Sequence, residues 1–179
     1  MKILLVGAHG TGKTTLAKEI QKVYPRFTII DGIHREAKQD GFEINKTDDV
    51  ISQIETVRRY WYKVGARNSF ISLDGMLRQT AYAICNKLPE PVIGLMKELC
   101  YIERKHFTDA IFYLPIEFLL EKDNVREEDK EFQEQVNTEI CSLLNTFYHY
   151  NYFAAAGSVD QRVARVCDVI QGFCGGIIK

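Results

Sequence analysis

Long hydrophobic runs are missing from this 179-residue sequence, although 46% of its residues are hydrophobic. No apolar stretch approaches the roughly 20 residues that a helix needs to cross a bilayer. The N-terminus enters the apolar segment Lys2–Val6 directly, without the pattern of a signal peptide. We therefore expect a soluble, cytoplasmic protein that does not span a membrane.

An excess of charge and paired cysteines are also missing. The sequence has 23 Lys and Arg against 24 Asp and Glu, a formal net charge of −1, and so lacks the overall basic character of a protein that coats nucleic acid, although a local patch stays possible. The five cysteines are odd in number and contain no C-x-x-C pair: Cys85, Cys100, Cys141, Cys167 and Cys174. This spacing argues against a disulfide scaffold and a zinc site, and we expect reduced, buried thiols.

Short apolar segments alternate with helical patterns along the chain. Strands are predicted at 2–6, 27–30, 69–73, 109–114 and 151–156, with helices from 14, over 47–65, from 78, over 93–102, over 128–147 and from 159. In the helix over 47–65, the spacing predicts a buried face of Val50, Ile54, Val57, Trp61 and Val64. The length fits one domain over residues 1–179 of the α/β class.

The segment Gly7–Thr14, GAHGTGKT, matches the P-loop pattern of two glycines five positions apart followed by lysine and a hydroxyl residue. An apolar strand precedes it and a helical pattern follows it, which is the context that the motif requires. The glycines Gly7, Gly10 and Gly12 allow backbone N–H groups to turn inward around an anion at a helix N-terminus. The segment therefore predicts a triphosphate site.

The other loop residues have distinct expected roles. Lys13 reaches the β- and γ-phosphates, and the Thr14 hydroxyl binds Mg²⁺. Thr15 packs or caps the helix beside the nucleotide. His9 and Thr11 lie in the variable part of the loop, where we expect His9 to face solvent near the phosphates rather than to act in catalysis.

Two further strands each end in an acid followed by glycine, at Asp31-Gly32 and Asp74-Gly75. Ligands bind at the carboxyl edge of an open α/β sheet, so both acids are candidates for general-base work on an acceptor. Asp74 also has the placement of an acid that holds Mg²⁺, and we favour it over Asp31. For Asp31, a simple turn-forming Asp-Gly pair is an equal alternative.

Basic side chains follow these positions. An arginine after each acid, Arg35 and Arg78, is a candidate for binding the substrate, against the common outcome of an exposed side chain. In the stretch 58–63, Arg58 and its aromatic neighbours are able to stack a base, although core packing of the aromatics with solvated arginines is favoured. The charged stretch 121–130 is typical of a solvated face or of a lid, in which Lys122 and Arg126 are candidates to close on the phosphoryl group.

The last strand ends in Gly157-Ser158, and small residues there let an adenine ring approach the backbone. Together with the P-loop, LRQTAYAI, DAIFYLP, DNVREED and AAAGSVDQRVARV, this segment resembles the AAA_28 or NadR-like group of P-loop kinases over nearly the whole chain. The resemblance implies a P-loop NTPase three-layer sandwich with a parallel five-stranded sheet of order 2-3-1-4-5 and a small lid at about 117–130. It also implies Arg126 as the lid arginine and Arg162 near the adenine of ATP.

By the same resemblance, the protein transfers the γ-phosphate of ATP-Mg to a small nucleoside- or nucleotide-like acceptor. The group commonly has Pro-Glu and Asp-Arg where this sequence has Asp31-Gly32 and Asp74-Gly75. Related phage kinases act on hydroxymethylated pyrimidines within DNA, and two small residues on the acceptor side allow that alternative. A P-loop ATPase switch that acts on a protein partner is a third hypothesis.

Overall fold

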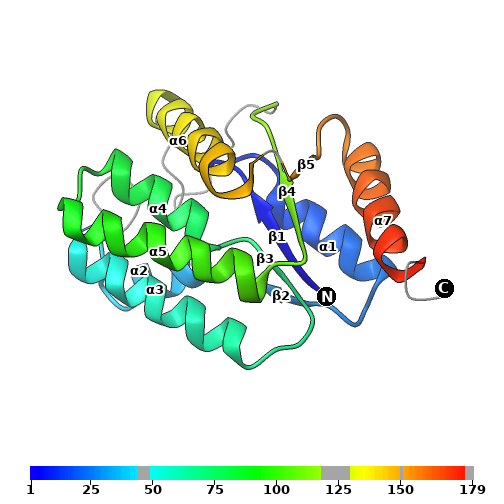
Figure 1. The fold of residues 1–179 in the computed structure, drawn as a ribbon, viewed down its shortest axis with the longest axis horizontal. Helices are drawn as coiled ribbons and strands as arrows, with labels where there is room; N and C mark the ends of the chain where they lie inside the picture. The colour runs from blue at the N-terminus through cyan, green and yellow to red at the C-terminus, as the bar shows by residue number, and fades with distance from the viewer. Residues whose placement is uncertain (44–48, 118–129, 150, 176–179) are drawn as a thin grey trace.

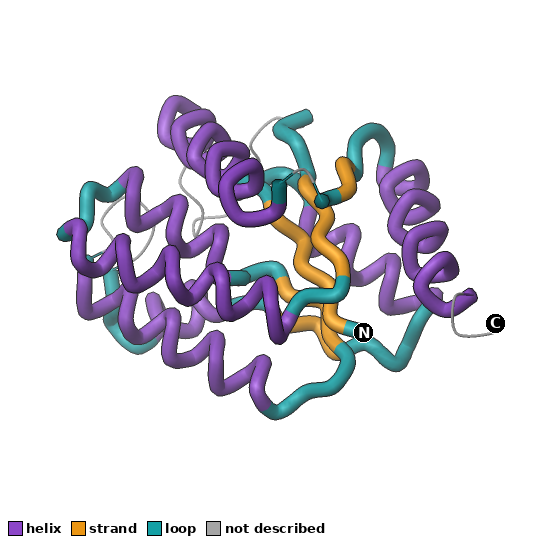
Figure 2. Tube along the Cα trace, viewed as in Figure 1, coloured by secondary structure: helices purple, strands orange, loops and turns teal. Residues whose placement is uncertain are grey.

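The computed structural model describes residues 1–43, 49–117, 130–149 and 151–175 (Figures 1 and 2). Its centre is a sheet of order β2-β3-β1-β4-β5 in which all neighbouring strands are parallel. The strands are β1 (Lys2–Val6), β2 (Thr28–Ile30), β3 (Phe70–Ser72), β4 (Ala110–Tyr113) and β5 (Phe153–Ala154). The expected strand order is confirmed.

Helices cover both faces of the sheet, which confirms the three-layer sandwich (Figure 1). Helices α1 (Lys13–Val23) and α7 (Val159–Gly175) contact each other over one face. The other face carries α2 (Ile33–Gln39), α3 (Val50–Gly65), α4 (Met76–Cys85), α5 (Glu90–Phe107) and α6 (Lys130–Tyr148).

The central strand β1 is buried on both faces. Leu4 and Val6 pack into the apolar cluster beneath α3–α6, whereas Ile3 and Leu5 pack into a second cluster with α1 and α7. Alternate residues of a strand point to opposite faces, so a strand covered on both sides is a continuous apolar run. This burial fixes the register of β1 and with it the place where the P-loop begins.

Because β1, β2 and β3 are parallel, their carboxyl ends meet at one edge of the sheet. The pairs Leu4↔Ser72 and Ile30↔Ser72 bring the three strands into register just before this edge. The P-loop, Asp31 and Asp74 therefore leave the sheet side by side, where open α/β sheets bind ligands.

The buried face of α3 differs in part from the prediction: Val64 is buried, and Val57 and Trp61 are half-buried against the core, as expected. Ile54 is 59% exposed, and the face turned inward carries Ser52, Gln53, Thr56, Tyr60 and Val64. The spacing of apolar residues does not predict these polar positions, because their side chains find hydrogen-bond partners in the interior beside α4. The Gln53 amide, for example, donates to Gln79 Oε1 at 3.5 Å. The helix is capped at its N-terminus by Asp49, whose carboxylate accepts from the Ser52 N–H at 2.7 Å.

Two smaller expectations are corrected. Helix α5 already begins at Glu90, because Pro91 is accommodated in its first turn. Of the cysteines, Cys100 is buried, whereas Cys85, Cys141 and Cys167 are half-buried, and all four are free thiols. Within the described part of the chain, we find no helix that combines the length and the apolarity needed to cross a membrane.

Candidate active site

The P-loop has the close-packed backbone that its glycines predict. A Cβ atom at Gly7 would lie 2.6 Å from the Leu114 carbonyl oxygen, so only glycine fits against β4. Gly10 and Gly12 have φ angles of 75° and 83°, in the left-handed region. The loop thus reaches the N-terminus of α1 in a conformation that other residues rarely adopt.

Lys13, the first residue of α1, is held by the loop itself. Its ammonium group donates to the Gly7 carbonyl at 2.9 Å, to the Ala8 carbonyl at 2.5 Å and to the Thr11 hydroxyl at 3.3 Å. The side chain is only 9% exposed. These bonds fix the position of the cation within the loop.

The next two threonines differ in their surroundings. Thr14 is half-buried, and its hydroxyl donates to Asp31 Oδ2 at 3.2 Å. Thr15 is exposed in the first turn of α1 and does not pack or cap as expected. The P-loop hydroxyl therefore meets the acid at the end of β2, Asp31, whereas the sequence favoured Asp74.

Asp31 lies where β2 gives way to α2. Its other oxygen accepts from the Gly32 N–H at 2.7 Å, and Gly32, with φ of 82°, turns the chain into the helix. A cavity of about 230 Å³ opens beside the carboxylate and is lined by Asp31, Gly32, Arg35, Glu36 and Gln39. The exposed Arg35 lies on the rim of this cavity, within reach of a solvent-borne ligand.

Asp74 has a different environment, since it is only 5% exposed and fully engaged. The Arg78 guanidinium donates to its Oδ1 at 3.1 Å, His34 Nδ1 lies 3.4 Å from the same oxygen, and the Ile33 N–H donates to Oδ2 at 3.3 Å. Burial raises the pKa of Asp74, but the His34 hydrogen bond and the Arg78 charge outweigh it and hold that pKa below its usual range. Burial and Arg78 lower the pKa of His34, so the imidazole is neutral.

This cluster continues to the P-loop through Tyr82 of α4. The Arg78 guanidinium lies 4.6 Å from the Tyr82 ring centroid, and the Tyr82 hydroxyl is 2.9 Å from His9 Nδ1. From α6, the Gln133 amide donates to the His9 carbonyl at 2.6 Å. His9 is 6% exposed, so the expectation that it faces solvent is wrong: Tyr82 and Phe132 enclose its ring.

Arg162 of α7 ties the P-loop to the turn after β5. Its guanidinium donates to the Thr11 carbonyl at 2.7 Å, to the Gly157 carbonyl at 3.0 Å and to the Glu117 carboxylate at 2.5 Å. The Gly157 N–H donates to the same carboxylate at 2.8 Å. Arg162 is 1% exposed, so it supports the loop from behind, while Ser158 is exposed beside it.

A family model described as an AAA domain, AAA_28, matches residues 2–162. The chain belongs to this family. The resemblance inferred from the motifs is thereby confirmed.

Solved structures with this fold include several kinases. NadR in complex with NR superposes with a TM-score of 0.75 at 16% identity, over 97% of this chain and 51% of that one. Deoxyadenosine kinase from M. mycoides gives 0.61 at 17% identity, over 97% and 100%. Thymidylate kinase from Candida albicans gives 0.66 at 16% identity, over 95% and 90%. This chain of the AAA_28 family thus spans about half the length of the NadR chain. No curated protein sequence matches it.

Not every expected residue joins the site. Lys122, Arg126 and most of the expected lid at 117–130 lie outside the described residues. Arg58 is on the exposed face of α3, where it pairs with Glu55 at 2.7 Å, and its aromatic neighbours divide between core and surface: Tyr60 is buried and Tyr62 is 81% exposed. The stretch 58–63 is therefore no continuous stacking surface.

Gly75, one of the departures from the family pattern, has a local explanation. A Cβ atom there would lie 3.2 Å from a carboxylate oxygen of Glu103, in the interior beneath α5. The side-chain position of Gly75 therefore points at the buried Glu103 carboxylate and not at a space for a ligand. Neither Gly75 nor Arg58 thus supports a site widened for DNA.

A hydroxyl and a carboxylate, groups of the type that Mg²⁺ prefers, meet where the P-loop passes the end of β2. Thr14 and Asp31 supply a hydroxyl and a carboxylate in contact, the hard donors that this ion prefers. Among the described residues there is no cluster of three or more His, Cys, Asp and Glu side chains able to hold a metal by themselves. Such sparse ligation suits Mg²⁺ that arrives with phosphate oxygens.

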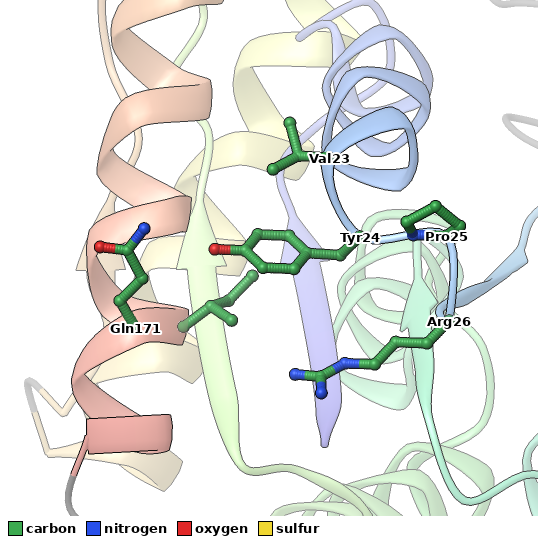
Figure 3. Close-up of a pocket in the computed structure, with 6 residues that line it drawn as sticks. Val23, Tyr24, Pro25, Arg26 and Gln171 are labelled. Carbon is green, nitrogen blue, oxygen red and sulfur yellow. The ribbon is translucent and has the colours of Figure 1, made fainter.

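A second cavity, of about 300 Å³, lies at the opposite end of α1 between that helix and α7 (Figure 3). Val23, Tyr24, Pro25, Arg26, Ile170 and Gln171 line it. Lys13 and Val23 are at opposite ends of α1, about 15 Å apart along an ideal helix. The cavity is therefore separate from the P-loop site.

Proposed function

We propose that the protein is an ATP-dependent phosphotransferase that moves the γ-phosphate of ATP-Mg to a hydroxyl or phosphate of a nucleoside- or nucleotide-like acceptor. The observation that carries this proposal is the contact between the P-loop hydroxyl Thr14 and the carboxylate of Asp31. It brings a phosphate cradle and a candidate base together at the carboxyl edge of the sheet.

On the nucleotide side, the roles follow from the loop geometry. The inward N–H groups and the N-terminus of α1 hold the phosphates, and Lys13 neutralises charge that develops during transfer. Arg162 links the Thr11 carbonyl to the Gly157 turn, which supports Gly157 and Ser158 as the backbone that an adenine approaches.

On the acceptor side, we assign the base to Asp31. Asp31 is half-buried, borders a cavity and is engaged by one hydroxyl and one N–H. Asp74 is paired with Arg78, and its pKa is held below its usual range, which makes it a weaker proton acceptor. Asp74 then serves to hold Arg78 and His34 in place.

In this proposal the Thr14 hydroxyl would hold Mg²⁺, which would neutralise charge on the phosphates, and the Asp31 carboxylate is left for the acceptor. The superposed proteins support the acceptor class. NadR was solved with NR, and the M. mycoides deoxyadenosine kinase with dCMP and dCDP. At 16–17% identity these likenesses support the fold, and they guide the choice of acceptors to test.

The test is transfer of γ-phosphate from ATP with Mg²⁺ to a panel of nucleosides, nucleotides, nicotinamide riboside and DNA with normal or hydroxymethylated pyrimidines. Lys13→Ala is the blank. Transfer to a nucleoside or nucleotide is the expected result, and transfer to DNA alone would favour the modified-base alternative. Hydrolysis without transfer, lost in the blank, would overturn the proposal in favour of an ATPase switch.

A further inference from the structure

Glu103 is a buried carboxylate that the proposed mechanism does not use. It lies in α5 with 0% exposure, and no described Lys, Arg or His forms an ion pair with it. Its partners are hydrogen-bond donors from two other elements: the Tyr60 hydroxyl of α3 and the Met76 N–H of α4, which is 3.1 Å from both carboxylate oxygens.

The contact with Met76 caps α4. Met76 is the first residue of that helix, and Gly75 at the N-cap has no side chain to satisfy the N–H groups of the first turn. Glu103 supplies this acceptor from a different helix, and its negative charge suits the positive end of the helix dipole. The anchored turn carries Asp74 on one side of Met76 and Arg78 on the other.

A second route connects Glu103 to the same turn. Tyr60, which donates to Glu103, also hydrogen-bonds the Ser72 side chain. The Ser72 hydroxyl in turn accepts from the Asp74 N–H at 3.3 Å. The backbone on both sides of Gly75 is therefore fixed to one buried carboxylate.

Gly75 is the residue that allows this approach. A Cβ atom at Gly75 would lie 3.2 and 3.3 Å from the two Glu103 oxygens, closer than most Cβ contacts. The backbone conformation at Gly75, with φ of −58°, is open to any residue. Space for the carboxylate, and not backbone strain, thus explains this glycine.

We propose that Glu103 is a positioning residue of the acceptor side: its carboxylate anchors the first turn of α4 and thereby places Asp74 and Arg78. The inference rests on the proposed kinase function, but the anchoring itself is measurable without an acceptor. Glu103 acts through the turn and does not touch the reacting groups.

Glu103 changes its charge state near neutral pH, so the effect of its charge on the turn is measurable by a pH titration. Burial raises the pKa of Glu103 to about 7, although its hydrogen bonds with Tyr60 and the backbone act in the opposite direction. The other titratable groups around it are Tyr60, Cys100 and Tyr148, and burial raises the pKa of each. At neutral pH, only Glu103 among these four titrates.

The test compares Glu103→Met, which keeps an unbranched side chain without an acceptor, with Glu103→Gln, which keeps the acceptor. Met96→Ala is the control for a packing defect in α5, since Met96 is buried in the same helix seven residues before Glu103, about two helical turns away. We expect Glu103→Met to lower acceptor turnover roughly 10- to 100-fold and to leave ATP affinity unchanged. Glu103→Gln should restore most of the loss, and Met96→Ala should cause none.

An acceptor-independent measurement is the NMR titration of His34, which lies against Asp74 and Arg78. A displaced turn in Glu103→Met shifts the pKa of His34, whereas Met96→Ala leaves it unchanged. Equal His34 titrations in wild type and Glu103→Met would overturn the positioning role. A shifted titration without transfer to any acceptor would uphold the anchor and count against the kinase.

If Glu103→Met does not fold, Gly75→Ala tests the same contact by pushing a methyl group toward the carboxylate. We expect it to shift the His34 titration and to be rescued by Glu103→Asp, which withdraws the carboxylate by one methylene. A wild-type titration in Gly75→Ala would contradict the proposal, and so would a shift that Glu103→Asp leaves in place.

Discussion

The proposed nucleotide side and the proposed acceptor side of this site are built in opposite ways. The nucleotide side is one continuous segment, Gly7–Thr14, in which Lys13 donates to oxygens of its own loop. The acceptor side is assembled from acids that follow β2 and β3 and from side chains of α2 and α4, and it places an ion pair in the interior. A backbone cradle is specified by a few glycines, whereas a side-chain cluster depends on helices that are distant in sequence.

The largest expected effect concerns the nucleotide side. Lys13→Ala removes the cation that the loop holds in place, and we expect phosphoryl transfer to fall by about 1,000-fold. The carbonyls of Gly7 and Ala8 can be solvated in its absence, so the fold should persist. Transfer assays and circular dichroism of the same sample measure both effects. Retained turnover would remove the basis for treating this side as catalytic.

On the acceptor side, the matched variants Asp31→Asn and Asp74→Asn distinguish the role of one acid from that of the other. Asp31→Asn should lower kcat roughly 100-fold with a small change in stability, because it removes a base at a half-buried position. Asp74→Asn leaves the Arg78 charge buried without a counter-ion, and it should cost about 3–5 kcal/mol of unfolding free energy. Chemical denaturation and kinetics of both variants decide the assignment, and the reverse pattern would make Asp74 the base.

A variant of Arg162 tests whether its hydrogen bonds to the P-loop backbone contribute to ATP affinity. Arg162→Met keeps the length of the side chain and removes the donors to Thr11, Gly157 and Glu117, so we expect ATP affinity to fall about tenfold. Arg165→Met on the exposed side of α7 is the control. Calorimetry of ATP binding measures the difference. Equal affinities would show that the loop holds its shape without Arg162.

How much of each side could be predicted from the sequence depends on whether its contacts lie within one segment or between distant elements. The P-loop and the two acids at strand ends followed from motifs and from the period of apolar residues, and the strand order followed from the resemblance to the AAA_28 group. His34, Tyr82 and Gln133 were not identified, because their roles arise from contacts between elements. His9 was misplaced for the same reason: whether a loop side chain is enclosed depends on α4 and α6.

The burial of Glu103 could have been predicted from the sequence. It lies on the buried stripe of α5 with Ile93, Met96 and Cys100, at the spacing of an apolar face. A charged residue at such a position is rarely buried unless it has partners. The sequence alone does not supply those partners, Tyr60 and the Met76 N–H, because they belong to other helices. The same limit applies to Gln53 and Thr56, which broke the predicted face of α3.

The smallest expected effect concerns Glu103, whose burial beside the proposed acceptor side lowers the free energy of unfolding. The nucleotide side has no such buried carboxylate in its loop. Because the folded-state pKa of Glu103 is raised from 4.5 to about 7, its ionisation disfavours the folded state, and stability is lost as pH rises from about 4.5 to 7. Glu103→Gln stays neutral, so its unfolding free energy should match that of the wild type at pH 4 and exceed it by up to about 3 kcal/mol at pH 8. Glu98→Gln, at an exposed position of the same helix, is the control in urea titrations across this range. A pH-independent difference for Glu103→Gln would mean that Glu103 has the same pKa in the folded and the unfolded protein, which would contradict the raised pKa. A difference that keeps growing above pH 8 would mean that Glu103 stays neutral in the folded protein, and that α4 is capped by a neutral acid.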